Sequence, residues 1–157
     1  MERPQRKRPA HQPVFKMGNR SEIVFVTVCI GSKRRLLDNE SAHALIKQAW
    51  LKSDHWLVGR YVIMPDHIHL FCAPARYDQL SVKRWIAYWK SIVTRGWPNP
   101  KDKPLWQRDG WDIQLRRGES YSAKWRYISE NPVRAGLAQR ADEWLYQGEL
   151  NQFAWHD

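Results

Sequence analysis

Cysteine, acidic residues and long apolar runs are all scarce in this sequence. Its two cysteines, Cys29 and Cys72, lie in apolar strand-like segments without CxxC spacing. This argues against a disulfide scaffold or a thiolate zinc site, and it predicts reduced core residues of an intracellular protein. No apolar run approaches the length needed to cross a bilayer, and residues 1–20 lack the apolar centre of a signal peptide, so neither a membrane-spanning nor a secreted protein is expected.

The shortage of acidic residues leaves a strongly basic chain. Lys and Arg number 26 against 16 Asp and Glu, which gives a formal net charge of +10. Such a charge produces a long-range field that attracts polyanions. Nucleic acid is therefore the leading expected partner.

The rest of the composition is sufficient for one globular domain. The chain has 157 residues, of which 43% are hydrophobic and 13% aromatic, enough for one ordinary core and too little for two. Residues 1–20 combine basic side chains and prolines with little apolar material. We expect them to form a flexible basic arm, followed by a single domain over residues 21–157.

The spacing of apolar residues predicts the order of elements. It indicates strands over 22–30, 56–64, 67–73 and 111–117, and helices over 41–53, 81–96 and 119–131. Ser41 is the expected N-cap of the first helix, and Pro65-Asp66 predicts a turn between the second and third strands. This βαββαβα order is typical of a ferredoxin-like split βαβ fold in the α+β class, an antiparallel sheet with helices packed on one face.

Two histidines stand one residue apart in the third predicted strand. Successive side chains of a strand point to opposite faces, so His67 and His69 share one face. Two adjacent imidazoles are half of a metal site, but an isolated pair of this kind more often faces solvent or hydrogen-bonds locally. No other His, Cys or carboxylate stands at a spacing that requires it to be a third ligand.

Two segments in order resemble a known family. "YVIMPDHIHLFC" (61–72) is similar to the histidine–hydrophobic–histidine motif of the HUH endonucleases, and "KWRYISENPVRAGL" (124–137) resembles the tyrosine-helix motif of IS200-like single-tyrosine transposases. The branch most similar to this chain is the REP-associated tyrosine transposases. The resemblance extends over roughly residues 20–155.

The resemblance implies roles for four residues. His67 and His69 would be metal ligands, Tyr127 the nucleophile, and Asn131 a third ligand, since positions i and i+4 share one face of a helix. Asn131 has a competing structural interpretation, because Asn followed by Pro is a good helix-stop and N-cap pair. Tyr121 is the rival nucleophile, but its position six residues earlier turns it about 240° away from Tyr127.

The implied chemistry is DNA strand transfer assisted by Mg²⁺ or Mn²⁺. A phenol with a pKa of about 10 is a weak nucleophile at neutral pH. Two imidazoles and an amide add no negative charge, so the ion would keep its full charge to polarise the scissile phosphate. The expected product is a 5′-phosphotyrosine with a free 3′-hydroxyl, and the expected substrate is single-stranded or hairpin DNA of a bacterial nucleoid. Asp66 is expected to serve the turn or to support the ligands from outside.

Basic residues outside the motif are candidates for binding DNA phosphates. The basic face of the second predicted helix could equally be a merely solvated surface. The candidates lie in the arm, on that helix, and around the tyrosine motif: Arg6, Lys7, Arg8, Lys83, Arg84, Lys90, Arg95, Arg116, Arg117, Lys124 and Arg126. We expect the arm and the basic helix to bind a DNA hairpin while the sheet carries out the chemistry.

Two other functions fit the same sequence features. One is a domesticated DNA-binding protein of the same fold without catalysis; the other is a metal-dependent hydrolase that releases free 5′-phosphate ends. Relatives often place a histidine after the acidic residue of the segment matched here by "WDIQLR", whereas this chain has Ile113. The sequence leaves open whether the protein acts as a monomer or a homodimer.

Overall fold

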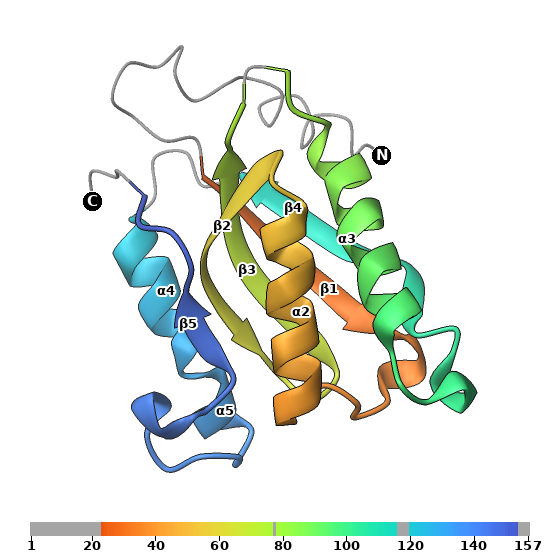
Figure 1. Cartoon of the computed structure of the whole chain (residues 1–157). Coiled ribbons are helices and arrows are strands. Elements are labelled where there is room, and N and C mark those ends of the chain that lie inside the picture. Colours follow the sequence, from red (N-terminus) through yellow and green to blue (C-terminus); the bar gives the residue numbers. More distant parts are fainter. Residues whose placement is uncertain (1–22, 77, 116–119, 154–157) are drawn as a thin grey trace.

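The computed structural model describes residues 23–76, 78–115 and 120–153 (Figure 1). The elements are β1 (Val24–Ile30), α2 (Glu40–Lys52), β2 (Trp56–Ile63), β3 (His67–Pro74), α3 (Val82–Gly96), β4 (Trp106–Leu115), α4 (Tyr121–Ser129), α5 (Asn131–Arg134) and β5 (Gln147–Glu149), with short 3-10 turns at Gly31–Lys33, Pro100–Asp102 and Ala141–Glu143. The predicted order of strands and helices is confirmed. The predicted arm, residues 1–20, lies outside the described residues.

The five strands form one antiparallel sheet in the order β4-β1-β3-β2-β5. The first four occupy the positions that a split βαβ fold requires, so the α+β fold class is confirmed. β5 pairs with the outer edge of β2; three residues are too short to show the alternation that predicts a strand. β4 begins at Trp106, earlier than predicted, because Trp106 pairs with Ile30 beyond an irregularity in the β1–β4 ladder.

Three boundaries show the local chemistry that sets them. The N-cap of α2 is Asn39, whose side chain accepts a hydrogen bond from the Ala42 N–H (2.8 Å), so the prediction of Ser41 was wrong. The predicted Pro65-Asp66 turn is present, and the Met64 N–H closes it on the His67 carbonyl (2.8 Å). The helix predicted over 119–131 ends at Ser129, and the chain begins a new helical turn, α5, at Asn131.

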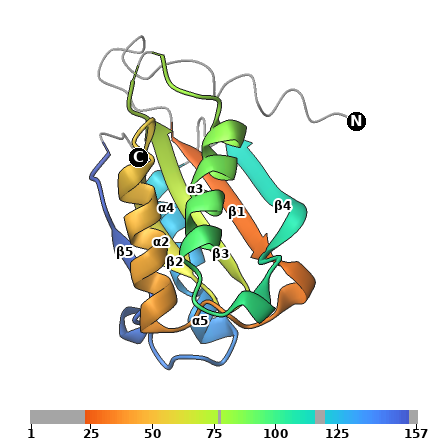
Figure 2. The same cartoon turned by 45° about the vertical axis from the view of Figure 1, so that its right-hand side comes forward.

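Both faces of the sheet are covered, by different helices. Val24, Val26 and Val28 of β1 belong to a large core with α2 and α3, whereas Phe25 and Phe71 belong to a second core with Tyr121 and Ile128 of α4. Figures 1 and 2 show α2 and α3 side by side on one face and α4 across the sheet from them. The prediction that the helices pack on one face was therefore wrong for α4.

The composition of the central strands explains this correction. β1 and β3 are apolar at almost every position, so each strand presents apolar side chains to both faces. A sheet of this kind is stable only when both faces are covered. In the part of the chain that the structure describes, no helix is long and apolar enough to cross a membrane.

Candidate functional site

His67 and His69 lie on the face of the sheet that α4 covers. Their ring centroids are 4.7 Å apart and the rings are nearly perpendicular (78°). The β1–β3 register places Thr27 opposite His69 and Cys29 opposite His67. The alternation of the strand therefore brings the two imidazoles together on one face, as the sequence predicts.

Each imidazole is held through its Nδ1 atom. Asp66 Oδ1 lies 2.7 Å from Nδ1 of His67, and Thr27 Oγ1 lies 2.9 Å from Nδ1 of His69. An ionised carboxylate only accepts, so His67 donates its Nδ1–H and Nε2 is the ring nitrogen that faces away from Asp66. The Nε2 atoms have no hydrogen-bond partner among the described residues, which leaves these atoms for a ligand.

His69 is kept neutral by its surroundings. Burial, followed by the nearby charges of His67, Lys124 and Arg134, lowers the pKa of His69 to about 3. The ring also stacks on Phe25, with centroids 5.4 Å apart and 19° between the planes. A neutral, fixed imidazole is the form of histidine that binds a metal ion.

Tyr127 lies on α4 with most of its side chain in solvent. It is 61% exposed, which makes it accessible to a DNA strand. The guanidinium carbon of Arg134 lies 4.1 Å from the centre of its ring and Lys124 Nζ lies 5.9 Å from it. Lys124 Nζ is also 5.0 Å from the ring of Phe25, which stacks on His69. A short series of contacts thus connects the predicted nucleophile to the histidine pair.

Tyr121, the rival nucleophile, is part of the core. It is 4% exposed, its ring packs edge-on against Phe71 (4.9 Å), and its hydroxyl accepts a hydrogen bond from the Arg60 backbone N–H (3.3 Å). Burial raises the pKa of Tyr121 to about 12. The structure therefore gives Tyr121 a packing role in the core.

Asn131 is the first residue of α5, and its side chain is already engaged. Its Oδ1 accepts a hydrogen bond from Arg134 Nη2. The competing interpretation made Asn131-Pro132 a helix stop and Asn131 an N-cap. The first part holds, because α4 ends at Ser129; the second does not, because the N-cap of α5 is Glu130. An amide oxygen has two lone pairs, so Asn131 could still bind an ion, although it would share that oxygen with a guanidinium.

The described donors fit a site with few protein ligands. No three His, Cys, Asp or Glu side chains of the described residues are grouped as a metal site. Asp66 contacts Nδ1 of His67 and so supports a ligand from outside. The Nε2 atoms of His67 and His69 and the amide oxygen of Asn131 are the candidate protein ligands. Such a set suits an ion whose remaining coordination positions are filled by substrate oxygens and water.

The predicted DNA-binding residues divide between two sides of the sheet. Lys124 lies at the site, and Arg126 is exposed on α4. The candidates on α3 are on the opposite side from the histidines, because α3 packs in the other core; they are Lys83, Arg84, Lys90 and Arg95. Arg6, Lys7, Arg8, Arg116 and Arg117 lie outside the described residues.

Three residues of the site were not singled out as site residues from the sequence. Thr27 and Phe25 contact His69 from β1, and Thr27 is 42 positions away from His69 along the chain. Arg134 contacts both Tyr127 and Asn131. A strand-pairing register could have identified Thr27, and the position of Arg134, seven residues after Tyr127, could have suggested a shared helix face.

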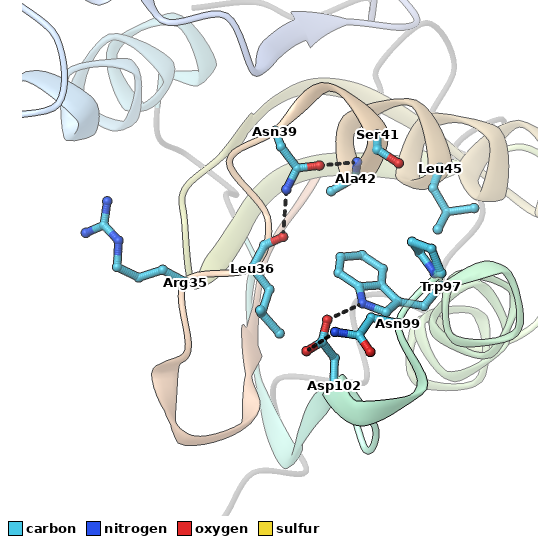
Figure 3. A pocket seen from close by; sticks show the side chains of 10 residues that line it. Arg35, Leu36, Asn39, Ser41, Ala42, Leu45, Trp97, Asn99 and Asp102 are labelled. Atoms are coloured by element: carbon cyan, nitrogen blue, oxygen red, sulfur yellow. Dashed lines mark hydrogen bonds between the residues drawn. The ribbon is translucent and has the colours of Figure 1, made fainter.

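A separate pocket lies between the start of α2 and the loop after α3 (Figure 3). It encloses about 230 Å³ and is lined by residues that include Arg35, Trp97 and Asp102. The Trp97 indole donates to Asp102 Oδ2 (2.8 Å), and Asn39 caps α2. None of the predicted site residues lines this pocket, so it is not part of the candidate site.

Comparisons with known proteins agree with the motifs. No family model matches the chain. The chain is 30% identical over 96 residues to a candidate REP-associated tyrosine transposase of Haemophilus influenzae, covering 54% of this chain and 53% of that protein. It is 27% identical over 106 residues to the REP-associated tyrosine transposase of Escherichia coli, covering 66% and 59%. The chain thus spans little more than half the length of these relatives.

Solved structures show the same fold. A REP-associated tyrosine transposase bound to a REP hairpin superposes with a TM-score of 0.63 at 21% identity, covering 82% of this chain and 76% of that one. A candidate transposase from Deinococcus radiodurans gives 0.51 at 12% identity, covering 70% and 90%. The resemblance to REP-associated tyrosine transposases that the two motifs indicate is confirmed.

Proposed function

We propose that this protein is a metal-dependent single-tyrosine DNA transposase, which cleaves and rejoins single-stranded or hairpin DNA through a 5′-phosphotyrosine on Tyr127. The observation that carries the proposal is the packing of α4 on the histidine face of the sheet. This packing places an exposed tyrosine, two fixed imidazoles and two cations on one side of the molecule. The relatives named as tyrosine transposases support the same reaction class.

His67 and His69 would hold Mg²⁺ or Mn²⁺ through Nε2, with Asn131 as the proposed third ligand. When bound, the ion would supply Lewis-acid polarisation of the phosphate oxygens. Asp66 and Thr27 orient the two rings before any ligand arrives. Phe25, stacked on His69, limits the positions that ring can adopt.

The reaction we propose is a transesterification with no net loss of phosphoester bonds. The hydroxyl oxygen of Tyr127 attacks the scissile phosphorus and forms a new P–O bond. The bond from phosphorus to the 3′ oxygen breaks, and that oxygen takes up the proton that the phenol gives up. Attack by the 3′-hydroxyl of another strand reverses these changes, frees Tyr127 and joins the DNA without an external energy source.

Hairpin DNA is the proposed substrate. One solved relative is bound to a REP hairpin, and the chain carries a formal charge of +10, which favours salt-sensitive binding to phosphates. Lys124 and Arg126 on α4 are the described cations on the same helix as Tyr127. We place the protein in the bacterial cytoplasm, at the nucleoid, as this substrate requires.

The first test is detection of the covalent product. End-labelled single strands that carry hairpin repeats from beside the gene are incubated with protein and Mn²⁺, and the products are separated on a denaturing gel. We expect a protein-linked band that chelator and Tyr127→Phe both abolish, while Tyr127→Phe still binds the hairpin. Tyr88→Phe, which changes an exposed tyrosine of α3, is the matched control and should keep the band.

Other outcomes would assign the protein to a different class. Tight hairpin binding without a covalent band, with either Mg²⁺ or Mn²⁺, would indicate the non-catalytic DNA-binding protein. Metal-dependent cleavage without protein-linked DNA would indicate a hydrolase. A band that persists in Tyr127→Phe would remove Tyr127 from the mechanism.

A further inference from the structure

Arg134 contacts the catalytic motif at three points. Its Nη2 donates to the carbonyl oxygen of Tyr127 (2.8 Å) and to Oδ1 of Asn131. Its guanidinium carbon lies 4.1 Å from the centre of the Tyr127 ring. The residue comes from α5, whose backbone continues from α4 through the bond from the Arg134 N–H to the Glu130 carbonyl (2.9 Å). A side chain at the surface is thereby held against the proposed nucleophile.

The hydrogen bonds of this guanidinium come from one nitrogen only. Both bonds come from Nη2, which carries two of the five N–H donors of an arginine. Nη1 and Nε have no hydrogen-bond partner among the described residues, and Arg134 is exposed. Each of these three remaining N–H groups can donate to a phosphate oxygen. The two Nη2 bonds orient the group, and Nη1 and Nε remain available to a ligand.

Arg134 is better placed to bind a phosphate than Lys124, the other cation beside Tyr127. Lys124 Nζ is 5.9 Å from the Tyr127 ring and also lies over Phe25. An ammonium is a point charge on a flexible stem, whereas a guanidinium held at two points has a defined direction.

We propose that Arg134 is a catalytic residue that binds the scissile phosphate beside Tyr127, and that Asn131 and the Tyr127 carbonyl position it. This proposal rests on the proposed function, since it names the group that receives the substrate phosphate. As the Tyr127 oxygen attacks, negative charge builds up on the non-bridging oxygens. A preorganised cation at that position stabilises the transition state more than the bound substrate.

The test separates binding from chemistry. Hairpin affinity is measured by fluorescence anisotropy, and the single-turnover rate of the covalent band is measured at saturating DNA. For Arg134→Ala we expect a rate about 100-fold lower with affinity changed by less than roughly 5-fold, as for loss of one preorganised donor. Arg134→Lys should recover only part of the rate. Arg140→Ala is the matched control, because Arg140 is exposed and pairs with Asp142.

Chemical rescue distinguishes a charge at the reacting atoms from a structural contact. Millimolar guanidinium should restore the rate of Arg134→Ala at least about 10-fold, and urea, a neutral molecule of the same shape, should not. Neither additive should restore Tyr127→Phe. Far-UV circular dichroism and thermal melting of Arg134→Ala confirm that α4 and α5 remain folded.

Several results would overturn the proposal. An unchanged rate in Arg134→Ala, or a reduced rate that guanidinium and urea affect equally, would show that Arg134 does not act on the phosphate. If the wild type forms the covalent band, either of these results for Arg134→Ala would leave the transposase proposal intact. Absence of a band in the wild type would overturn both proposals together.

Discussion

At the residue scale, the two histidines are held by partners of different kinds. Asp66 gives His67 a charged partner at a partly exposed position, whereas Thr27 gives His69 a neutral hydroxyl beside the Phe25 ring. A carboxylate increases the electron density of the ring it contacts, and a hydroxyl mainly fixes the orientation. The orientation of His69 therefore depends on one hydroxyl group from a neighbouring strand.

Thr27→Val should weaken metal binding while leaving the fold in place. Valine keeps the shape of threonine but leaves Nδ1 of His69 without its partner. We expect the Mn²⁺ concentration for half-maximal covalent-band formation to rise about 10-fold, and calorimetric titration of Mn²⁺ to show the same decrease in affinity. Thr27→Ser retains the hydroxyl and serves as the control. Equal Mn²⁺ affinities in wild type and Thr27→Val would show that the hydroxyl does not position His69.

At the element scale, Tyr121 attaches the start of α4 to the sheet. Its ring packs on Phe71 and Phe153, and Arg60 lies 5.3 Å from the ring centre. The sheet is adapted to this contact at Gly59, where a Cβ would lie 2.9 Å from the Tyr121 hydroxyl oxygen and 2.6 Å from Phe153. The position of Tyr127 over the histidine face therefore depends on a close contact that is formed six residues earlier in the chain.

The burial of Tyr121 predicts a loss of stability in alkali. Its pKa is raised to about 12 in the folded chain against about 10 when unfolded. Between these two pH values the unfolded state releases the Tyr121 proton while the folded state keeps it. The contribution of Tyr121 to stability is therefore fully present below pH 10 and is lost as the pH rises above it. Denaturant unfolding at pH 9 and pH 11 should show that the wild type loses about 1 kcal/mol more than Tyr121→Phe. Equal losses in the two proteins would contradict this assignment.

At the scale of the whole molecule, the sheet separates two basic surfaces. α3 presents exposed Lys83, Arg84 and Arg95 on one side, whereas Lys124 and Arg134 lie with Tyr127 on the other. The expectation that the α3 helix binds the hairpin while the histidine face does the chemistry would require DNA to pass around a sheet edge. In the proposed reaction, the cations of α4 would contact the same DNA strand as Tyr127 without such a detour.

Paired charge removals test which surface the hairpin contacts. Lys124→Ala/Arg126→Ala and Lys83→Ala/Arg84→Ala remove the same net charge, so long-range attraction changes equally. We expect the α4 pair to reduce the slope of log affinity against log salt by roughly 0.7–0.9 for each DNA phosphate that the protein no longer neutralises, and the α3 pair to change it by less. A larger change for the α3 pair would show that the hairpin crosses α3.

The sequence by itself determined the features that depend on local periodicity. The order of strands and helices and the shared face of His67 and His69 follow from spacings of two or of three to four residues. The two motifs also indicated the family resemblance. These predictions hold because neighbouring side chains of one element have directions set by the backbone alone.

The tertiary structure decided everything that joins distant segments. It placed α4 on the face opposite α2 and α3, brought Thr27 to His69, and paired β5 with β2. Almost uniformly apolar strands do not indicate which helix covers which face. Such choices depend on packing between elements, which no local spacing of residues encodes.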